Sequence, residues 1–250
     1  MSVQTLLNLR QFGAPVSLQL DMGEIVSLDQ WRVDHMRAGA ADAAPAFFFD
    51  LADPLSYLSA ERVERNLGGA EWIPVSSQML LPGGPGASVD ADARRGYAEA
   101  QAQALRLPLV WPDSFPDPVP CAQRAAAYAV AIGAGPQFAL AASRLAFCGG
   151  FDLSDPETLA EAAAASAVPL SSCLRAAGDP AWDAPLKATA HSLRLRGIRE
   201  LPAFRAGRRW FEGGTGLLRA AAGLEQTGGR ARASLAPVGG QARGPLAPVG

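Results

Sequence analysis

The sequence feature that most constrains the fold is an apolar run that changes abruptly into a helix start. Residues 46–51 read AFFFDL, a pattern typical of a short buried strand, and residues 54–66 read as a helix that ends before two glycines. Asp53 and Pro54 stand between them, and aspartate followed by proline is a favoured helix start. A strand that leads directly into a helix predicts an α/β protein. Free backbone N–H groups converge at such a helix start, where proteins often place reactive groups.

The order of the remaining patterns predicts one sheet interrupted by helices. A second strand is predicted near residues 71–76, and helical patterns dominate residues 91–195. Residues 201–205 and 208–211 read as a hairpin, and residues 217–224 as a final helix. Strands from both ends of this region must meet in one sheet, so the helices between them form an insertion.

Four segments follow from this order. We expect a weakly structured N-terminal extension over residues 1–45 and a helical insertion over residues 91–183. The sheet domain is expected to combine residues 46–90 with residues 184–226. Residues 227–250 are rich in glycine, alanine, arginine and proline, a composition that buries too little apolar surface to fold, so we expect a disordered tail.

Composition excludes several classes of function. A net charge of −2 and a pI near 5.7 provide no basic surface for nucleic acid or anionic lipid. No apolar stretch reaches the roughly 18 residues of a membrane span, and the start lacks a secretory pattern. Cys121, Cys148 and Cys173 lie too far apart for a zinc site or a local dithiol pair. We therefore expect a cytoplasmic protein without a metal, a nucleic-acid partner or a membrane partner.

Six segments form a recognisable series: residues 48–58, 71–75, 94–97, 115–116, 147–157 and 197–204. In this order they resemble segments of proteins with the DsbA-like thioredoxin fold. They are most similar to the branch that holds 2-hydroxychromene-2-carboxylate isomerases and kappa-class glutathione transferases. The resemblance implies an α/β fold, a thioredoxin fold with a helical insertion, with a cis peptide bond at Leu201–Pro202. It also implies a small-molecule substrate, glutathione as a cofactor and a homodimer.

The first departure from this pattern lies at the reactive position. The resemblance places Asp53 where that branch has a serine that favours the glutathione thiolate, and where DsbA-type oxidoreductases have the first cysteine of C-x-x-C. Ser56 fills the second position of that motif. A carboxylate beside a thiolate disfavours the thiolate, since two like charges raise a pKa. The motif contains no thiol, which excludes a dithiol disulfide oxidoreductase acting through it.

The second departure lies after the hairpin. Where the family has an acidic residue for the glutathione amine, this chain has Gly214 and Thr215, and a threonine cannot pair with an ammonium group. The lysine that such sites use for the glutathione carboxylate is also missing, and Arg94 or Arg95 could replace it. The residues that the resemblance assigns to substrate or glutathione binding are Leu201, Pro202, Gly214, Thr215, Arg94 and Arg95.

Two interpretations of Asp53 therefore stay open. It either caps the helix only, a role worth about 1 kcal/mol, or it also acts as a general base with Ser56 assisting and Pro202 behind the pocket. The second interpretation predicts a divergent isomerase, or an enzyme like a glutathione transferase, acting on a small aromatic carboxylated substrate. The first predicts a catalytically inactive DsbA-like binding or scaffold protein. A carboxylate that shuttles protons needs a pKa raised by burial.

Overall fold

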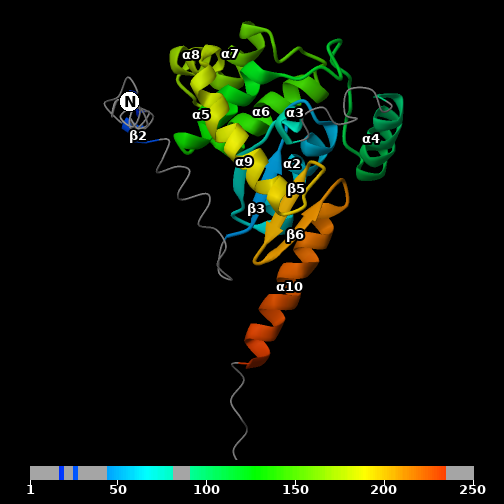
Figure 1. Cartoon of the computed structure of the whole chain (residues 1–250). Coiled ribbons are helices and arrows are strands. Elements are labelled where there is room, and N and C mark those ends of the chain that lie inside the picture. The colour runs from blue at the N-terminus through cyan, green and yellow to red at the C-terminus, as the bar shows by residue number, and fades with distance from the viewer. Residues whose placement is uncertain (1–16, 20–24, 28–43, 81–90, 235–250) are drawn as a thin grey trace, which may run out of the picture.

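The computed structural model describes residues 17–19, 25–27, 44–80 and 91–234 (Figure 1). At its centre is a four-stranded sheet in the order β4-β3-β5-β6. Strand β3 pairs in parallel with β4 and antiparallel with β5, which pairs antiparallel with β6. The strands are β3 (Ala46–Phe49), β4 (Glu71–Pro74), β5 (Ala203–Ala206) and β6 (Arg209–Glu212).

Helices cover both faces of this sheet. Helix α2 (Pro54–Leu67) connects the parallel strands β3 and β4, and α10 (Gly216–Ser234) packs against it and against β5 and β6. On the other face, the short helix α3 (Ser77–Leu80) packs against α9 (Asp183–Leu195). Side chains of a strand alternate between the two faces, so Phe47 and Phe49 belong to the first layer and Phe48 to the second.

The predicted apolar run forms the centre of the core. Phe47 is 0% exposed, and its ring stacks on those of Phe49 and Phe204 at centroid distances of 5.5 and 5.4 Å. Trp72 of β4 meets the same ring edge-on at 5.0 Å. Stacked and edge-on aromatic contacts across neighbouring strands fix the register of β3 between β4 and β5.

The helical insertion lies between α3 and α9. Its helices α5 to α8 pack through small buried alanines, and α6 also packs on α2 of the sheet domain. A bidentate ion pair between Arg144 of α6 and Glu61 of α2, at 2.6 and 2.7 Å, joins the two parts. The helices are α4 (Ala91–Leu105), α5 (Pro120–Ala131), α6 (Gly135–Phe147), α7 (Pro156–Ala165) and α8 (Leu170–Gly178), followed by the 3-10 turn η2 (Pro180–Trp182).

The two predicted terminal segments differ in part from expectation. Within the predicted N-terminal extension, Ser17–Gln19 pairs antiparallel with Ile25–Ser27, while its other residues up to 43 lie outside the described residues. Helix α10 continues to Ser234, so residues 227–234 of the predicted tail are helical, since alanine and arginine in this stretch favour helix. The rest of that predicted tail, residues 235–250, lies outside the described residues.

Two peptide bonds in the described chain are cis. Leu201–Pro202 is one of them, which confirms the expectation from the sequence. Phe115–Pro116 is the other, and nothing in the sequence pattern indicated it.

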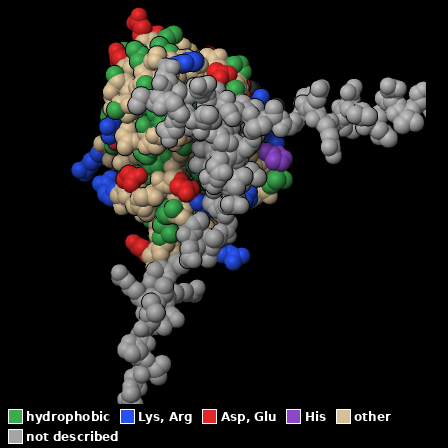
Figure 2. Space-filling model, turned by 90° about the vertical axis from the view of Figure 1, so that its left-hand side faces the viewer, with side chains coloured by type: hydrophobic (Ala, Val, Ile, Leu, Met, Phe, Trp, Pro, Cys, Tyr) green, Lys and Arg blue, Asp and Glu red, His purple; other side chains and the backbone are tan. Residues whose placement is uncertain are grey.

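Surface properties agree with the composition. No helix in the described ranges is long and apolar enough to cross a membrane. On the face shown in Figure 2, basic side chains are interspersed with acidic ones, in keeping with the net charge of −2.

Replacing Phe47 by alanine tests this packing. Removing a fully buried ring leaves a cavity beside Phe49, Trp72 and Phe204, so we expect Phe47→Ala to lower the free energy of unfolding by about 3–5 kcal/mol. Urea denaturation followed by circular dichroism measures the change. The control is Leu218→Ala on α10, where the side chain is 52% exposed, and we expect that change to stay within about 0.5 kcal/mol. Similar losses in both variants would contradict the assignment of the core.

Candidate functional site

Asp53 caps helix α2 from a fully enclosed position. Its backbone is extended, with φ −104° and ψ 117°, and its carboxylate accepts hydrogen bonds from the backbone N–H groups of Ser56 at 2.8 Å and Leu55 at 3.4 Å. The residue is only 2% exposed. The predicted cap is therefore confirmed, but the charged group is held inside the protein, whereas a cap on the surface would be hydrated.

Ser56 supports this carboxylate from within the helix. Its hydroxyl donates to Asp53 Oδ2 at 2.8 Å and accepts from the backbone N–H of Asp50 at 3.2 Å. Both hydrogen-bonding directions of the hydroxyl are thus used inside the protein, where Ser56 is 2% exposed. This geometry fits a residue that orients Asp53.

Arg94 and Arg95, predicted as alternatives, point to different places. Arg94 of α4 approaches Asp53, with 3.3 Å between Nη2 and Oδ1, and its side chain is 44% exposed. Arg95 lies 5.1 Å from the ring centroids of both Trp111 and Phe115, and donates to the Phe115 carbonyl at 3.3 Å. The structure therefore brings Arg94 to Asp53, while Arg95 fastens α4 to the loop before α5.

Burial changes the proton affinity of Asp53. The pKa of this carboxyl is raised from 3.8 to about 6, mainly by loss of hydration and to a smaller extent by the nearby charge of Asp50. The charge of Arg94 and the hydrogen bonds from Ser56 act in the opposite direction and keep the rise moderate. A carboxyl whose pKa lies this close to neutrality can both accept and release a proton under physiological conditions.

Asp50 anchors the turn that carries Asp53. Its Oδ1 accepts from the backbone N–H of Ala52 at 2.9 Å and from Gln123 Nε2 at 2.5 Å, and its Oδ2 accepts from the Ser77 N–H at 2.7 Å. One buried carboxylate thus joins the end of β3, the start of α3 and helix α5 of the insertion. The sequence offered one signal for this role, an acidic residue at the end of an apolar strand.

The cis proline lies at the same edge of the sheet. Phe48 pairs with Ala203, so Pro202, one residue before β5, lies beside the end of β3 and the turn that follows. Leu201 and Pro202 are buried, and the N–H of Gly213 donates to the Pro202 carbonyl at 2.9 Å. The antiparallel pairing of β3 and β5 therefore places the predicted backing residue next to the turn that carries Asp53.

The turn after β6 carries no acidic side chain at Gly214 or Thr215 that could pair with an ammonium group. Gly214 is half-buried and Thr215 is exposed, and no side-chain hydrogen bond of Thr215 is present in the described part of the chain. Glu200 and Tyr97, which the sequence analysis did not assign to the site, lie beside this turn instead. A Cβ at Gly213 would be 3.1 Å from Glu200 Oε2, and a Cβ at Gly214 would be 3.0 Å from the Tyr97 hydroxyl.

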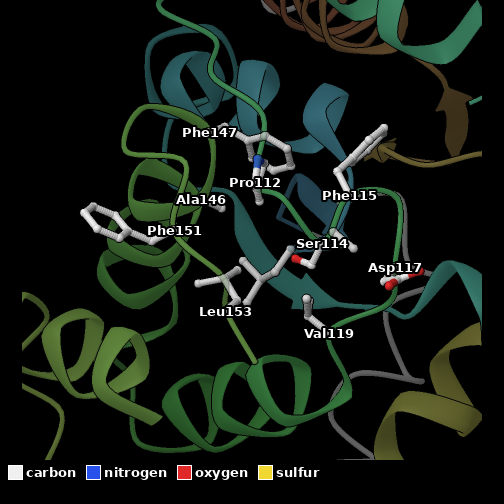
Figure 3. A pocket seen from close by; sticks show the side chains of 11 residues that line it. Pro112, Ser114, Phe115, Asp117, Val119, Ala146, Phe147, Phe151 and Leu153 are labelled. Atoms are coloured by element: carbon white, nitrogen blue, oxygen red, sulfur yellow. The ribbon is translucent and has the colours of Figure 1, made fainter. Parts of the chain in front are cut away.

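An apolar recess adjoins the turn that precedes Asp53 (Figure 3). It is shallow, with a cavity volume of about 20 Å³, room for about one water molecule, and it is partly open to solvent. Leu51 and Ala52 line one side, and the loop before α5 supplies Ser114 and Asp117 as polar groups. The remaining lining side chains are Pro112, Phe115, Val119, Ala146, Phe147, Phe151 and Leu153.

Comparison with solved structures identifies the fold. The chain is similar to a 2-hydroxychromene-2-carboxylate isomerase, with a TM-score of 0.62 and 15% identity over 77% of this chain and 98% of that chain. A probable DsbA oxidoreductase from Streptomyces coelicolor gives 0.59 and 18% over 82% and 93%. A protein described as a disulfide isomerase from Nitrosomonas europaea gives 0.57 and 16% over 75% and 98%.

These likenesses establish the fold class. The chain has the DsbA-like thioredoxin fold, an α/β fold with a helical insertion, as the sequence predicted. No protein-family model and no curated protein matches the sequence.

The surroundings of Asp53 disfavour a thiolate. Its buried carboxylate already accepts three hydrogen bonds from residues of its own helix and faces Arg94. A thiolate placed there would meet a like charge in a poorly hydrated environment. Within the described ranges, no group of three His, Cys, Asp or Glu side chains could hold a metal ion.

The pH dependence of stability tests the environment of Asp53. Because the folded pKa of about 6 exceeds the unfolded value of 3.8, Asp53 stabilises the fold at low pH, and this contribution is lost as the pH rises through 6. We therefore expect Asp53→Asn to become more stable relative to wild type by about 2–3 kcal/mol between pH 4 and pH 8. Urea unfolding at both pH values measures this, with the exposed Asp113→Asn as a control. A difference that stays constant with pH would contradict burial of the charge.

Proposed function

We propose that this protein is an isomerase-like enzyme that acts on a small aromatic carboxylated substrate, with Asp53 as its general base. The observation that carries the proposal is the buried Asp53 carboxylate, whose pKa is raised to about 6 at the start of α2. An ordinary helix cap needs neither burial nor a raised pKa, whereas a general base that works near neutral pH needs both. The likeness to a 2-hydroxychromene-2-carboxylate isomerase supports the reaction class.

The surroundings of Asp53 support binding of such a substrate. Arg94 is 44% exposed and uses one of its donors toward Asp53, so other guanidinium N–H groups can bind a carboxylate. The recess beside Leu51 and Ala52 offers apolar and aromatic side chains to a ring. In the proposal, the substrate carboxylate binds at Arg94 and its ring packs against the open mouth of the recess.

The proposed reaction is a proton shift within the substrate. Asp53 removes a proton from one atom of the substrate, and the electron pair of that bond moves into the conjugated system. The protonated carboxyl then returns the proton to a different atom, which leaves the enzyme unchanged and the substrate isomerised. Ser56 orients the carboxylate through its hydroxyl, and no thiol takes part.

A specific observation favours a second function. Three donors from Leu55 and Ser56 already satisfy the Asp53 carboxylate, as expected for a purely structural cap. Together with the missing acidic residue at Gly214 and Thr215, this supports an inactive binding or scaffold protein on the same fold. Activity of the purified protein separates the two functions.

The assay uses 2-hydroxychromene-2-carboxylate, with conversion followed by absorbance, with and without glutathione. We expect turnover that does not depend on glutathione and that falls by about 10²-fold or more in Asp53→Asn, as is usual for loss of a general base. The Asp113→Asn variant should retain wild-type turnover.

Two outcomes would contradict the enzyme proposal. Absence of turnover in the wild type would favour the scaffold, and turnover that requires glutathione would exclude the thiol-free reaction.

A further variant, Asp53→Ser, restores the serine that the resemblance expects. Glutathione binding gained by this variant in calorimetry would show that the rest of the site is intact.

A further inference from the structure

Helix α4, which carries Arg94, has little apolar surface with which to pack against the rest of the protein. Among residues 92–105, only Ala98 and Ala102 are buried, and an alanine side chain contributes a small apolar area. The position of this helix therefore depends on the polar and aromatic contacts that it makes with the segment that follows it.

Trp111 of that following segment contacts α4 at two points. The guanidinium carbon of Arg95 lies 5.1 Å from the Trp111 ring centroid, and the indole N–H donates to Glu99 Oε1 at 2.9 Å. Arg95 and Glu99 are four residues apart and therefore lie on one stripe of the helix. Two contacts along one stripe fix both the rotation of the helix about its axis and its position along that axis.

The core of the protein holds Trp111 in place. Its ring packs against that of Phe115 at a centroid distance of 4.6 Å and meets Phe147 edge-on at 6.4 Å. Phe147 is 1% exposed and stacks on Tyr57 of α2 at 5.7 Å. This chain of rings therefore connects α4 to α2, the helix that Asp53 caps.

The rotation of α4 decides where Arg94 points. Neighbouring residues on an α-helix point about 100° apart, so the contact of Arg95 with Trp111 also sets the direction of Arg94. In the structure this direction brings Arg94 Nη2 to 3.3 Å from Asp53 Oδ1. A rotation of α4 would move the guanidinium away from that carboxylate.

We propose that Trp111 is a positioning residue, which fixes the rotation of α4 and thereby holds Arg94 beside Asp53. The inference rests on the proposed function, because Arg94 is also the group that binds the substrate carboxylate there. Trp111 acts through Arg95 and Glu99 and takes no part in the proton shift. Loss of its contacts lets Arg94 move away, which removes a positive charge from the neighbourhood of Asp53.

Carbon-13 NMR titration of the Asp53 carboxyl in the full-length protein tests this role. The charge of Arg94 lowers the pKa of Asp53, so Trp111→Leu should raise that pKa toward the value in Arg94→Gln. We expect a rise of about 0.2–0.7, the range for a partly exposed ion pair. The matched control is Trp210→Leu on β6, which removes a half-buried ring that also carries an arginine, Arg196 at 5.3 Å. This control should titrate like wild type.

A double variant separates positioning from a general loosening of the fold. In an Arg94→Gln background, Trp111→Leu should no longer change the Asp53 titration, since its effect acts through Arg94. An Asp53 pKa that Trp111→Leu leaves unchanged, or a rise that is as large without Arg94, would overturn the proposal.

Variants of Glu99 test the same contact without removing the ring. Glu99→Ala removes the acceptor of the indole N–H and should raise the pKa of Asp53, whereas Glu99→Gln keeps an acceptor oxygen. Both variants remove the same charge, so the difference between them reports the hydrogen bond to Trp111. Equal Asp53 titrations in this pair would overturn the proposal, also where Trp111→Leu fails to fold.

Benzoate binding separates this inference from the proposed function. Benzoate should bind to Trp111→Leu about two- to fivefold more weakly than to wild type or to Trp210→Leu, and equal affinities would overturn the role of Trp111. If benzoate binds to none of them, the carboxylated substrate is excluded, and the Asp53 titration alone then decides the role of Trp111. A wild-type pKa near 4 contradicts the general base, and a wild-type pKa of about 6 that Trp111→Leu leaves unchanged contradicts only the role of Trp111.

Discussion

The site depends on the burial of the Asp53 carboxylate at the start of α2, where loss of hydration costs free energy. Hydrogen bonds from Leu55 and Ser56 and the charge of Arg94 offset part of that cost. They do not offset all of it, because the pKa remains raised to about 6. A capping role alone does not require this cost, and a proton-transfer role does. The part of the desolvation cost that these contacts leave uncompensated is the physical basis for considering Asp53 functional.

The surrounding structure keeps that carboxylate in place. The aromatic stack around Phe47 fixes β3 within the sheet, and Asp50 ties the end of β3 to α3 and to α5 of the insertion. Ser56 then joins Asp50 to Asp53 through its hydroxyl. Since these links are buried or partly buried, the core of both parts of the protein sets the position of the Asp53 carboxylate.

Much of the fold follows from the sequence, because local patterns determine it. The apolar run of β3, the Asp53–Pro54 helix start and the glycines after Leu67 each indicate an element without help from distant residues. The location of the site follows from the same run. Helix α3 is too short to show a helical period, and the end of α10 lies in a stretch of mixed helix propensity. The sequence therefore did not predict the bounds of these two helices. Burial of Asp53, the different partners of Arg94 and Arg95, and the approach of Glu200 to Gly213 are tertiary effects, and no local pattern encodes them.

The central claim is that a buried carboxyl with a pKa near neutral lies at the start of α2 in a DsbA-like thioredoxin fold. Site-specific carbon-13 NMR of Asp53 in the wild-type protein, titrated from pH 3 to pH 9, tests it most directly. The structure predicts a midpoint of about 6. A midpoint near 4, the ordinary value of a hydrated aspartate, would show that the carboxylate is an ordinary solvated cap and would contradict the claim.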